Sequence, residues 1–175
     1  MTPWGQPDAA LVQFAYVVEE IDDAMVRYVE RLGVGPWFRR GPFRPTQARY
    51  RGGPCESTFS VARAFTGHVM VELIQQHDDS PSVFHPGGPR RYGFHHWARM
   101  TKDFDGELVR CAALGWEEAF FDVVPSGARV AYVDATRDVA GMLELVEWTE
   151  AQEQVYADVY RAAVDWDGRE PIRVG

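Results

Sequence analysis

The sequence predicts an α+β fold of two tandem βαβββ modules followed by a C-terminal helix. Two observations predict it: an internal near-repeat, and a succession of short apolar runs separated by glycine and proline turns. The repeat is seen when Gln13 is placed over His96. That register also aligns Ala15 with Ala98, Asp22 with Asp105, Val26 with Val109, and Arg27 with Arg110. Each copy has the pattern of a strand, an acidic turn, an amphipathic helix and a glycine stop.

Each half opens with a strand and a helix. The expected elements are a strand over 12–18 and a helix over 22–32 ending at Gly33, then a strand over 95–101 and a helix over 106–114 ending at Gly115. Asp22 and Asp105 have the side chains that suit a helix N-cap, and glycine tolerates the left-handed conformation that ends many helices.

Strand-like runs complete each half. They cover about 57–65 and 68–75 in the first half, and about 119–124, 128–134 and 142–148 in the second. A stretch rich in proline and glycine separates the halves, and apolar positions over about 150–165 predict a last helix. The expected boundaries are 1–80 for the first module, 81–93 for the linker, 94–150 for the second module, and 151–175 for the C-terminal helix and tail.

Composition narrows the functional classes. The chain of 175 residues is 46% hydrophobic, enough for a core, and its net charge of −8 argues against nucleic acid as a partner. No apolar run is long enough to cross a bilayer, so no membrane association is expected. The first ten residues show no secretory signal, and Cys55 and Cys111 lack CxxC spacing. We therefore expect a cytoplasmic protein with reduced thiols.

Four polar residues interrupt apolar strands. Glu72 lies within VMVELI and Glu144 within MLELV, while Gln13 and His96 interrupt the first strand of each half. A buried carboxylate must be paired, protonated or bound to a metal. The repeat register relates these residues across the halves, so a pseudo-twofold arrangement would bring all four together at a metal site. Alternation of side chains along a strand directs His95 away from His96, toward the core or the surface.

With these residues the chain resembles the vicinal oxygen chelate superfamily, the glyoxalase and bleomycin-resistance fold, over about residues 11–150. The resemblance is carried by the Gln13 strand and by the segments LGVGPWF at 32–38, VEL at 71–73, GFHH at 93–96 and GMLEL at 141–145. Methylmalonyl-CoA epimerase and the glyoxalase-like proteins around it are the nearest in pattern. The resemblance implies paired βαβββ modules around one divalent metal ion.

The resemblance also implies the ligands, which by position are Gln13, Glu72, His96 and Glu144. This Gln/Glu/His/Glu set is the pattern of zinc-dependent glyoxalase I, whereas the epimerase more often has His at the first position. The set therefore leaves both activities open. A mixed oxygen and imidazole shell suits Zn²⁺, Co²⁺, Mn²⁺, Ni²⁺ or Fe²⁺.

In that family the metal polarises a carbonyl, so that a proton on the adjacent carbon becomes removable through an enolate. The resemblance implies Glu144 as one base, because a ligand carboxylate can leave the metal and take the proton. Glu56 stands 16 residues ahead of Glu72, a spacing that resembles the second base of the epimerase. A solvated carboxylate in a turn is the alternative for Glu56.

The expected function is a metal-dependent isomerase, epimerase or lyase. The alternatives are a glyoxalase I-like lyase, a ring-cleaving dioxygenase, in which Gln13 would stand where another His belongs, and a non-enzymatic binder of the bleomycin-resistance kind. Five arginines between residues 39 and 51 indicate a small-molecule substrate that is anionic or CoA-linked, or else form a solvated loop. The resemblance favours a homodimer. The residues after 150 either cap the pocket or cover a sheet edge.

Overall fold

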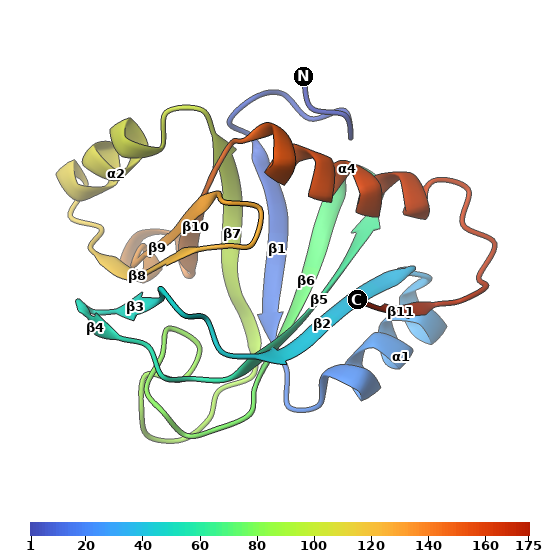
Figure 1. Ribbon diagram of the computed structural model, residues 1–175, viewed down its shortest axis with the longest axis horizontal. Coiled ribbons are helices and arrows are strands. Elements are labelled where there is room, and N and C mark those ends of the chain that lie inside the picture. The colour runs from blue at the N-terminus through green and yellow to red at the C-terminus, as the bar shows by residue number, and fades with distance from the viewer.

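The computed structural model describes residues 1–175 and confirms the α+β fold, with a helix near the C-terminus (Figure 1). The first half contains β1 (Leu11–Val17), α1 (Ile21–Leu32), β2 (Trp37–Phe43), β3 (Arg49–Tyr50), β4 (Gly53–Pro54), β5 (Phe59–Thr66) and β6 (Val69–Gln76). The second half contains β7 (Gly93–Thr101), α2 (Phe104–Ala113), β8 (Glu118–Val123), β9 (Arg129–Val133), α3 (Thr136–Val139) and β10 (Met142–Glu147). The chain ends with α4 (Glu150–Ala163) and β11 (Ile172–Val174).

All strands belong to one mixed sheet, in the order β11-β2-β5-β6-β1-β7-β10-β9-β8-β3-β4. The opening strands of the two halves, β1 and β7, pair antiparallel at its centre. Each is flanked by the closing strand of its own half, since β6 runs parallel to β1 and β10 runs parallel to β7. The centre of the sheet therefore has the pseudo-twofold arrangement that the repeat predicts. The exact module boundaries stay a prediction.

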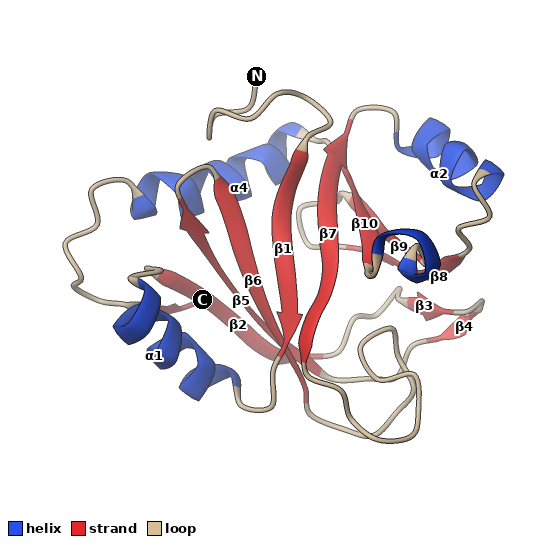
Figure 2. Cartoon of the chain, turned by 180° about the vertical axis from the view of Figure 1, so that it is seen from behind, coloured by secondary structure: helices blue, strands red, loops and turns tan.

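The helices lie on both faces of the sheet, with α1 and α2 on one face and α4 on the other (Figure 2). On one face, α1 packs against Val71 and Leu73, and α2 packs against Leu143 and Leu145. On the other face, α4 packs over the central strands through Tyr156. Side chains alternate along a strand, so the glutamates between these apolar pairs point to the face that α4 covers.

The predicted N-caps are wrong for both long helices of the repeat. α1 has no side-chain cap, and Asp103 caps α2 by accepting a hydrogen bond from the backbone. Each helix begins one residue before its aspartate, so Asp22 and Asp105 lie in the first turn, two residues beyond the N-cap. There they pair with arginines from the sheet, Arg39 at 2.7 Å and Arg129 at 2.8 Å.

β2 is not predicted from the sequence, because Gly41 and Pro42 inside WFRRGPF are typical of a turn. In the structure a register shift between Arg40 and Phe43 accommodates both residues within the pairing to β5. Gly41 has a φ of 106°, and a Cβ at this position would lie 2.6 Å from the Phe59 carbonyl oxygen. Only glycine fits this close approach of two backbones.

Two observations relate to the predictions about the cysteines and about membrane-spanning segments. Cys55 and Cys111 are both buried and form no disulfide. None of the helices combines the length and the apolar character needed to cross a bilayer. The cytoplasmic location stays a prediction.

Candidate metal centre

The central strands β6, β1, β7 and β10 each contribute one polar side chain to a single cluster: Glu72, Gln13, His96 and Glu144. Ala15 lies in register between Glu72 and His96, and Ala98 lies in register between the other two. Both alanines are fully buried. A methyl group at these two positions leaves space above the sheet for the four larger side chains.

The Gln13 amide nitrogen lies at the middle of this cluster. It is 3.1 Å from Glu72 Oε2, 3.2 Å from Glu144 Oε2 and 3.4 Å from His96 Nε2. His96 Nε2 is in turn 3.3 Å from Glu144 Oε2 and 3.7 Å from Glu72 Oε2. All four residues are at most 5% exposed, so their polar atoms depend on one another, on other buried side chains and on a bound group for their interactions.

The donor atoms fit a divalent cation. Metal–ligand bonds of roughly 2.0–2.2 Å place the donor atoms of one ion roughly 3.0–4.3 Å apart. The ligand atoms of Glu72, His96 and Glu144 all lie within 4.8 Å of one another. A positive charge would also stabilise the two buried carboxylates, which lie beside a neutral imidazole. This arrangement suits a transition metal with mixed oxygen and nitrogen ligands, and it does not select one metal.

The prediction that His95 faces away from His96 is wrong. The pairing of β1 with β7 shifts register between His96 and Phe94, so His95 is the extra residue of a β-bulge. A bulge interrupts the alternation of side chains, and the two Nδ1 atoms lie 2.9 Å apart. The corresponding bulge in β1 falls at Val12, directly before Gln13.

The contact with His95 sets the tautomer of His96. Burial lowers the pKa of His95 to about 3 and that of His96 to about 4, so both rings are neutral near pH 7. His95 Nε2 lies 3.0 Å from the Val83 carbonyl oxygen and must carry the hydrogen there. His95 Nδ1 then accepts from His96 Nδ1, which leaves a free lone pair on His96 Nε2. Metal-binding histidines are commonly oriented by a second residue in this way.

The two glutamates have different partners on the neighbouring strand. Glu72 lies opposite Arg63 in β5, whose Nε donates to Glu72 Oε1 at 2.6 Å. Glu144 lies opposite the neutral Tyr132 in β9. Burial raises the pKa of Glu144 to about 7, although Arg63 and hydrogen bonds from Tyr132 and Gln13 favour the ionised form. Arg63 and Tyr132 are site residues that the sequence reasoning does not identify.

α4 reaches the cluster through polar side chains. Tyr156 OH donates to Gln13 Oε1 at 3.2 Å, and Ser126 Oγ donates to Gln152 Oε1 at 2.6 Å. Tyr156 and Gln152, one helical turn apart, both line the cavity described below. The C-terminal segment takes both of the roles considered for it, since α4 caps the pocket and β11 covers a sheet edge by pairing with β2. A half-turn of the Gln13 amide would direct Oε1 at a cation and Nε2 at the Tyr156 hydroxyl, which also accepts.

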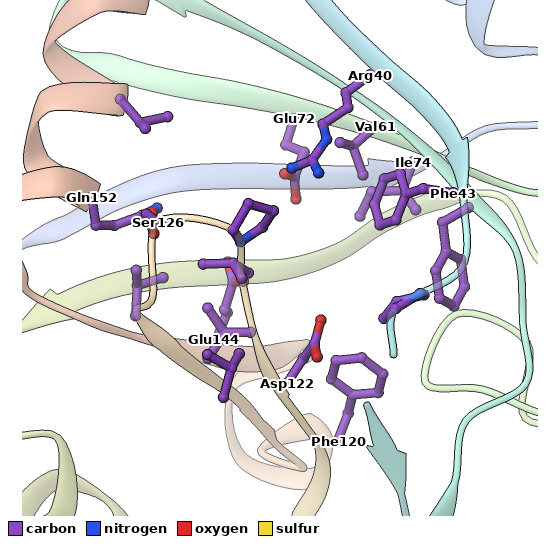
Figure 3. Close-up of a pocket in the computed structure, with 18 of the residues that line it drawn as sticks. Arg40, Phe43, Val61, Glu72, Ile74, Phe120, Asp122, Ser126, Glu144 and Gln152 are labelled. Carbon is purple, nitrogen blue, oxygen red and sulfur yellow. The ribbon is translucent and has the colours of Figure 1, made fainter. Parts of the chain in front are cut away.

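A cavity of about 620 Å³ adjoins the cluster (Figure 3). Glu72 and Glu144 line it, and most of the other lining is apolar and comes from both halves of the chain. Its size and lining are those of a small-molecule site. Arg40, which makes no ion pair, also lines it, as does Arg44.

Glu56 is placed apart from the other predicted site residues. Its side chain is 65% exposed and pairs with Arg44 at 2.9 Å, and it does not line the cavity. The structure brings Asp122 of β8 to the cavity instead. The sequence analysis does not identify Asp122, although a lone carboxylate in the apolar run AFFDVV is the same signal that indicates Glu72 and Glu144.

The chain belongs to the glyoxalase/bleomycin resistance protein/dioxygenase superfamily, whose family model matches residues 12–132. Among solved structures, methylmalonyl-CoA epimerase from Mycobacterium tuberculosis superposes with a TM-score of 0.53 at 14% identity, covering 82% of this chain and 91% of that one. A hypothetical protein from Bacillus halodurans C-125 gives 0.53 at 15% identity, covering 82% and 97%. No curated protein sequence matches. At this identity, the similarity to the solved structures shows the fold alone.

Proposed function

We propose that this protein is a divalent-metal-dependent isomerase, epimerase or lyase that removes a proton from the carbon beside a carbonyl of a small organic or acyl-thioester substrate. The observation that supports it most is the convergence of Gln13, Glu72, His96 and Glu144 beside a cavity of about 620 Å³. The family description names glyoxalases and dioxygenases, and a neighbour of the same fold is a methylmalonyl-CoA epimerase.

The ligand residues have distinct roles in this proposal. A bound divalent cation supplies positive charge that polarises the substrate carbonyl and stabilises an enolate. His96 presents its Nε2 lone pair, fixed by His95, and Glu72 is held by Arg63. Both positions are rigid, which suits residues that stay in place through a reaction.

Glu144 is the proposed base that takes the proton. It lines the cavity and its cross-strand neighbour, Tyr132, is uncharged. No arginine forms an ion pair with Glu144 comparable to the bond between Arg63 and Glu72. A carboxylate without a fixed cation is free to exchange a proton with a substrate. Glu56 stays a predicted second base, with its exposed position against that role.

The arginines support an anionic substrate. Arg40 lines the cavity without a carboxylate partner, and its guanidinium lies over the Phe43 ring at 5.1 Å. An arginine held in this way can bind a carboxylate or a phosphate of a substrate at the cavity wall. The apolar lining suits an acyl chain. An acyl-thioester with an acid group combines both features.

Metal binding is the first test. Chelator-treated protein is titrated calorimetrically with Zn²⁺, Co²⁺, Mn²⁺ and Ni²⁺, and we expect one ion per chain with at least one of them. His96→Ala should abolish binding. Glu118→Gln, an exposed carboxylate on β8, is the matched control and should bind as the native protein does. A native protein that binds none of these ions would refute the proposal.

Proton exchange is the second test. Metal-loaded protein is incubated in D₂O with methylmalonyl-CoA, propionyl-CoA and α-hydroxyketones, and deuterium at the carbon beside the carbonyl is followed by NMR. We expect exchange with at least one substrate, and a loss of at least 100-fold in Glu144→Gln, because acid–base groups contribute about 10²–10⁴-fold to rate. Exchange with none of them would contradict the enolate chemistry.

A glyoxalase I-like reaction is the second candidate, because Gln13 occupies the position where the epimerase more often has His. Turnover of a hemithioacetal of glutathione, without exchange into acyl-thioesters, would favour it. The homodimer stays a prediction, which the mass of the protein in solution by light scattering would check.

A further inference from the structure

Asp122 is a third carboxylate in the cavity, and no residue of the protein balances it. The acidic residues that line the cavity are Glu72, Glu144 and Asp122. Asp122 is only 9% exposed, its Oδ1 is inaccessible and has no hydrogen-bond partner, and it takes part in no ion pair. Glu72 has Arg63, and Glu144 has Gln13 and His96 close by.

The strand register places Asp122 on the same face of the sheet as Glu144. Asp122 pairs with Val130, and Val130 pairs with Val146, two residues beyond Glu144. Two strand spacings, about 10 Å, therefore separate the two backbones across the sheet. Figure 3 shows both side chains at the cavity, on different strands. The two carboxyl groups thus line one cavity from strands that are not neighbours.

A buried carboxylate without an ion-pair partner, and with one oxygen that accepts no hydrogen bond, lowers the stability of a folded protein. Burial also raises the pKa of Asp122 above its ordinary value. Stability is commonly lost in this way where a side chain faces a ligand instead of the protein. The carboxyl group of Asp122, which lines the cavity and has no ion-pair partner, is thus suited to exchange a proton with a substrate there.

We propose that Asp122 is a catalytic acid–base group that returns a proton to the substrate carbon from which Glu144 removes one; this inference rests on the proposed function. In the first step the C–H bond breaks, its proton bonds to the Glu144 carboxylate, and the electron pair moves into the carbonyl as an enolate. An Asp122 carboxyl in its protonated form, which this direction of the epimerisation requires, then gives its proton to the same carbon. The enolate electron pair forms the new C–H bond, and Asp122 is left as a carboxylate.

Exchange with water restores both carboxyl groups to their starting protonation states, so the cycle needs no oxidant, reductant or further reactant. Delivery from a second direction inverts the carbon, which is an epimerisation. This assignment gives the role of second base to Asp122 in place of the exposed Glu56.

The test separates proton removal from proton return. Metal-loaded native protein and Asp122→Asn are given one C2 epimer of methylmalonyl-CoA in D₂O. Deuterium in the remaining substrate and conversion to the other epimer are followed separately. We expect Asp122→Asn to keep deuterium exchange within about threefold of the native rate and to lose conversion by at least 100-fold. A structural role would lower both rates together.

The controls make each outcome decisive. Glu118→Gln should leave both rates unchanged. Asp122→Asn should melt no lower than the native protein, because it removes an unpartnered buried carboxylate, and a melting temperature lower by several degrees would show a structural role and overturn the inference. Unchanged conversion in Asp122→Asn, or the same split in Glu56→Gln instead, would also overturn it. Absence of exchange in the native protein would instead refute the proposed function, and this inference with it.

Discussion

The opening strands of the two halves share a backbone design and differ in the side chains that they bring to the site. Each pairs through a β-bulge directly before its polar residue, at Val12 before Gln13 and at His95 before His96. In the first half the bulge residue is a buried apolar side chain, and the amide oxygen of Gln13 accepts a hydrogen bond from Tyr156 of α4. In the second half the bulge residue is itself polar and holds the imidazole. A symmetric frame thus supports an asymmetric set of ligands.

The closing strands show the same contrast. Each glutamate lies opposite one residue of the preceding hairpin strand, Arg63 for Glu72 and Tyr132 for Glu144. One carboxylate is therefore paired with a cation and the other with a neutral hydroxyl. Two glutamates that the repeat makes equivalent acquire different chemistry from a single neighbour each, which is how enzymes assign acid, base and ligand roles.

The largest effect is expected from a substitution that removes this difference between the two glutamates. Arg63→Met leaves Glu72 buried without its cation, which should destabilise the metal-free protein by about 3–5 kcal/mol. Tyr132→Phe removes one hydrogen bond near Glu144 and should cost about 1–2 kcal/mol. Urea unfolding of both variants measures this, and saturating metal should recover more of the loss in Arg63→Met. Equal losses in the two variants would contradict the contrast between the halves.

The next effect depends on pH. The pKa of Glu144 is raised to about 7 from 4.5. A raised carboxyl pKa contributes stability that is present below the ordinary value and is lost as pH rises through the raised value. Metal-free native protein should therefore lose stability relative to Glu144→Gln between pH 4.5 and 7, by up to roughly 3 kcal/mol. The titrations of His95 and His96 are common to both proteins and largely cancel.

Unfolding curves at intervals of half a pH unit, with chelator present, give this difference. Metal should reverse its sign above pH 7, because binding needs the ionised carboxylate that only the native protein supplies. A difference that does not change with pH would show that Glu144 titrates in the folded protein as it does in the unfolded chain.

These contrasts also show how much of the site the sequence predicts. The sequence predicts Gln13, Glu72, His96 and Glu144, because each is a lone polar residue in an apolar strand and the repeat relates them in pairs. The same reasoning would also predict Arg63 as a site residue. A two-residue turn after Thr66 fixes the hairpin register that puts Arg63 opposite Glu72.

Other site residues depend on features that a single sequence does not reveal. The β-bulge that turns His95 toward His96 adds one residue to a strand without leaving a mark in its composition. Tyr156 reaches Gln13 from 143 positions away, through the docking of α4 on the sheet. Only its spacing from Glu72 indicates Glu56 as a base, and spacing does not predict how exposed a side chain is. Long-range packing decides all three cases.

A smaller effect is expected at the bulge. His95→Ala removes the acceptor that fixes the His96 tautomer and should weaken metal binding about 10- to 100-fold, the range found when a residue behind a ligand is lost. Val12→Ala at the equivalent bulge should leave metal affinity within about twofold, since it removes no polar contact. Calorimetric titration with Zn²⁺ compares the two. Comparable losses would mean that the bulges act only through the backbone.

The smallest effect concerns the Gln13 amide. Tyr156→Phe deletes the hydroxyl that contacts Gln13 Oε1 while keeping the ring that packs against the sheet. If the amide turns to offer Oε1 to a cation, the variant loses one hydrogen bond of about 0.5–1.5 kcal/mol, or up to roughly tenfold in metal affinity. Gln13→Glu in the same background supplies an oxygen in either orientation and should restore affinity. An unchanged affinity in Tyr156→Phe would show that α4 closes the cavity without orienting the amide, and the asymmetry of the ligands would then originate within the sheet alone.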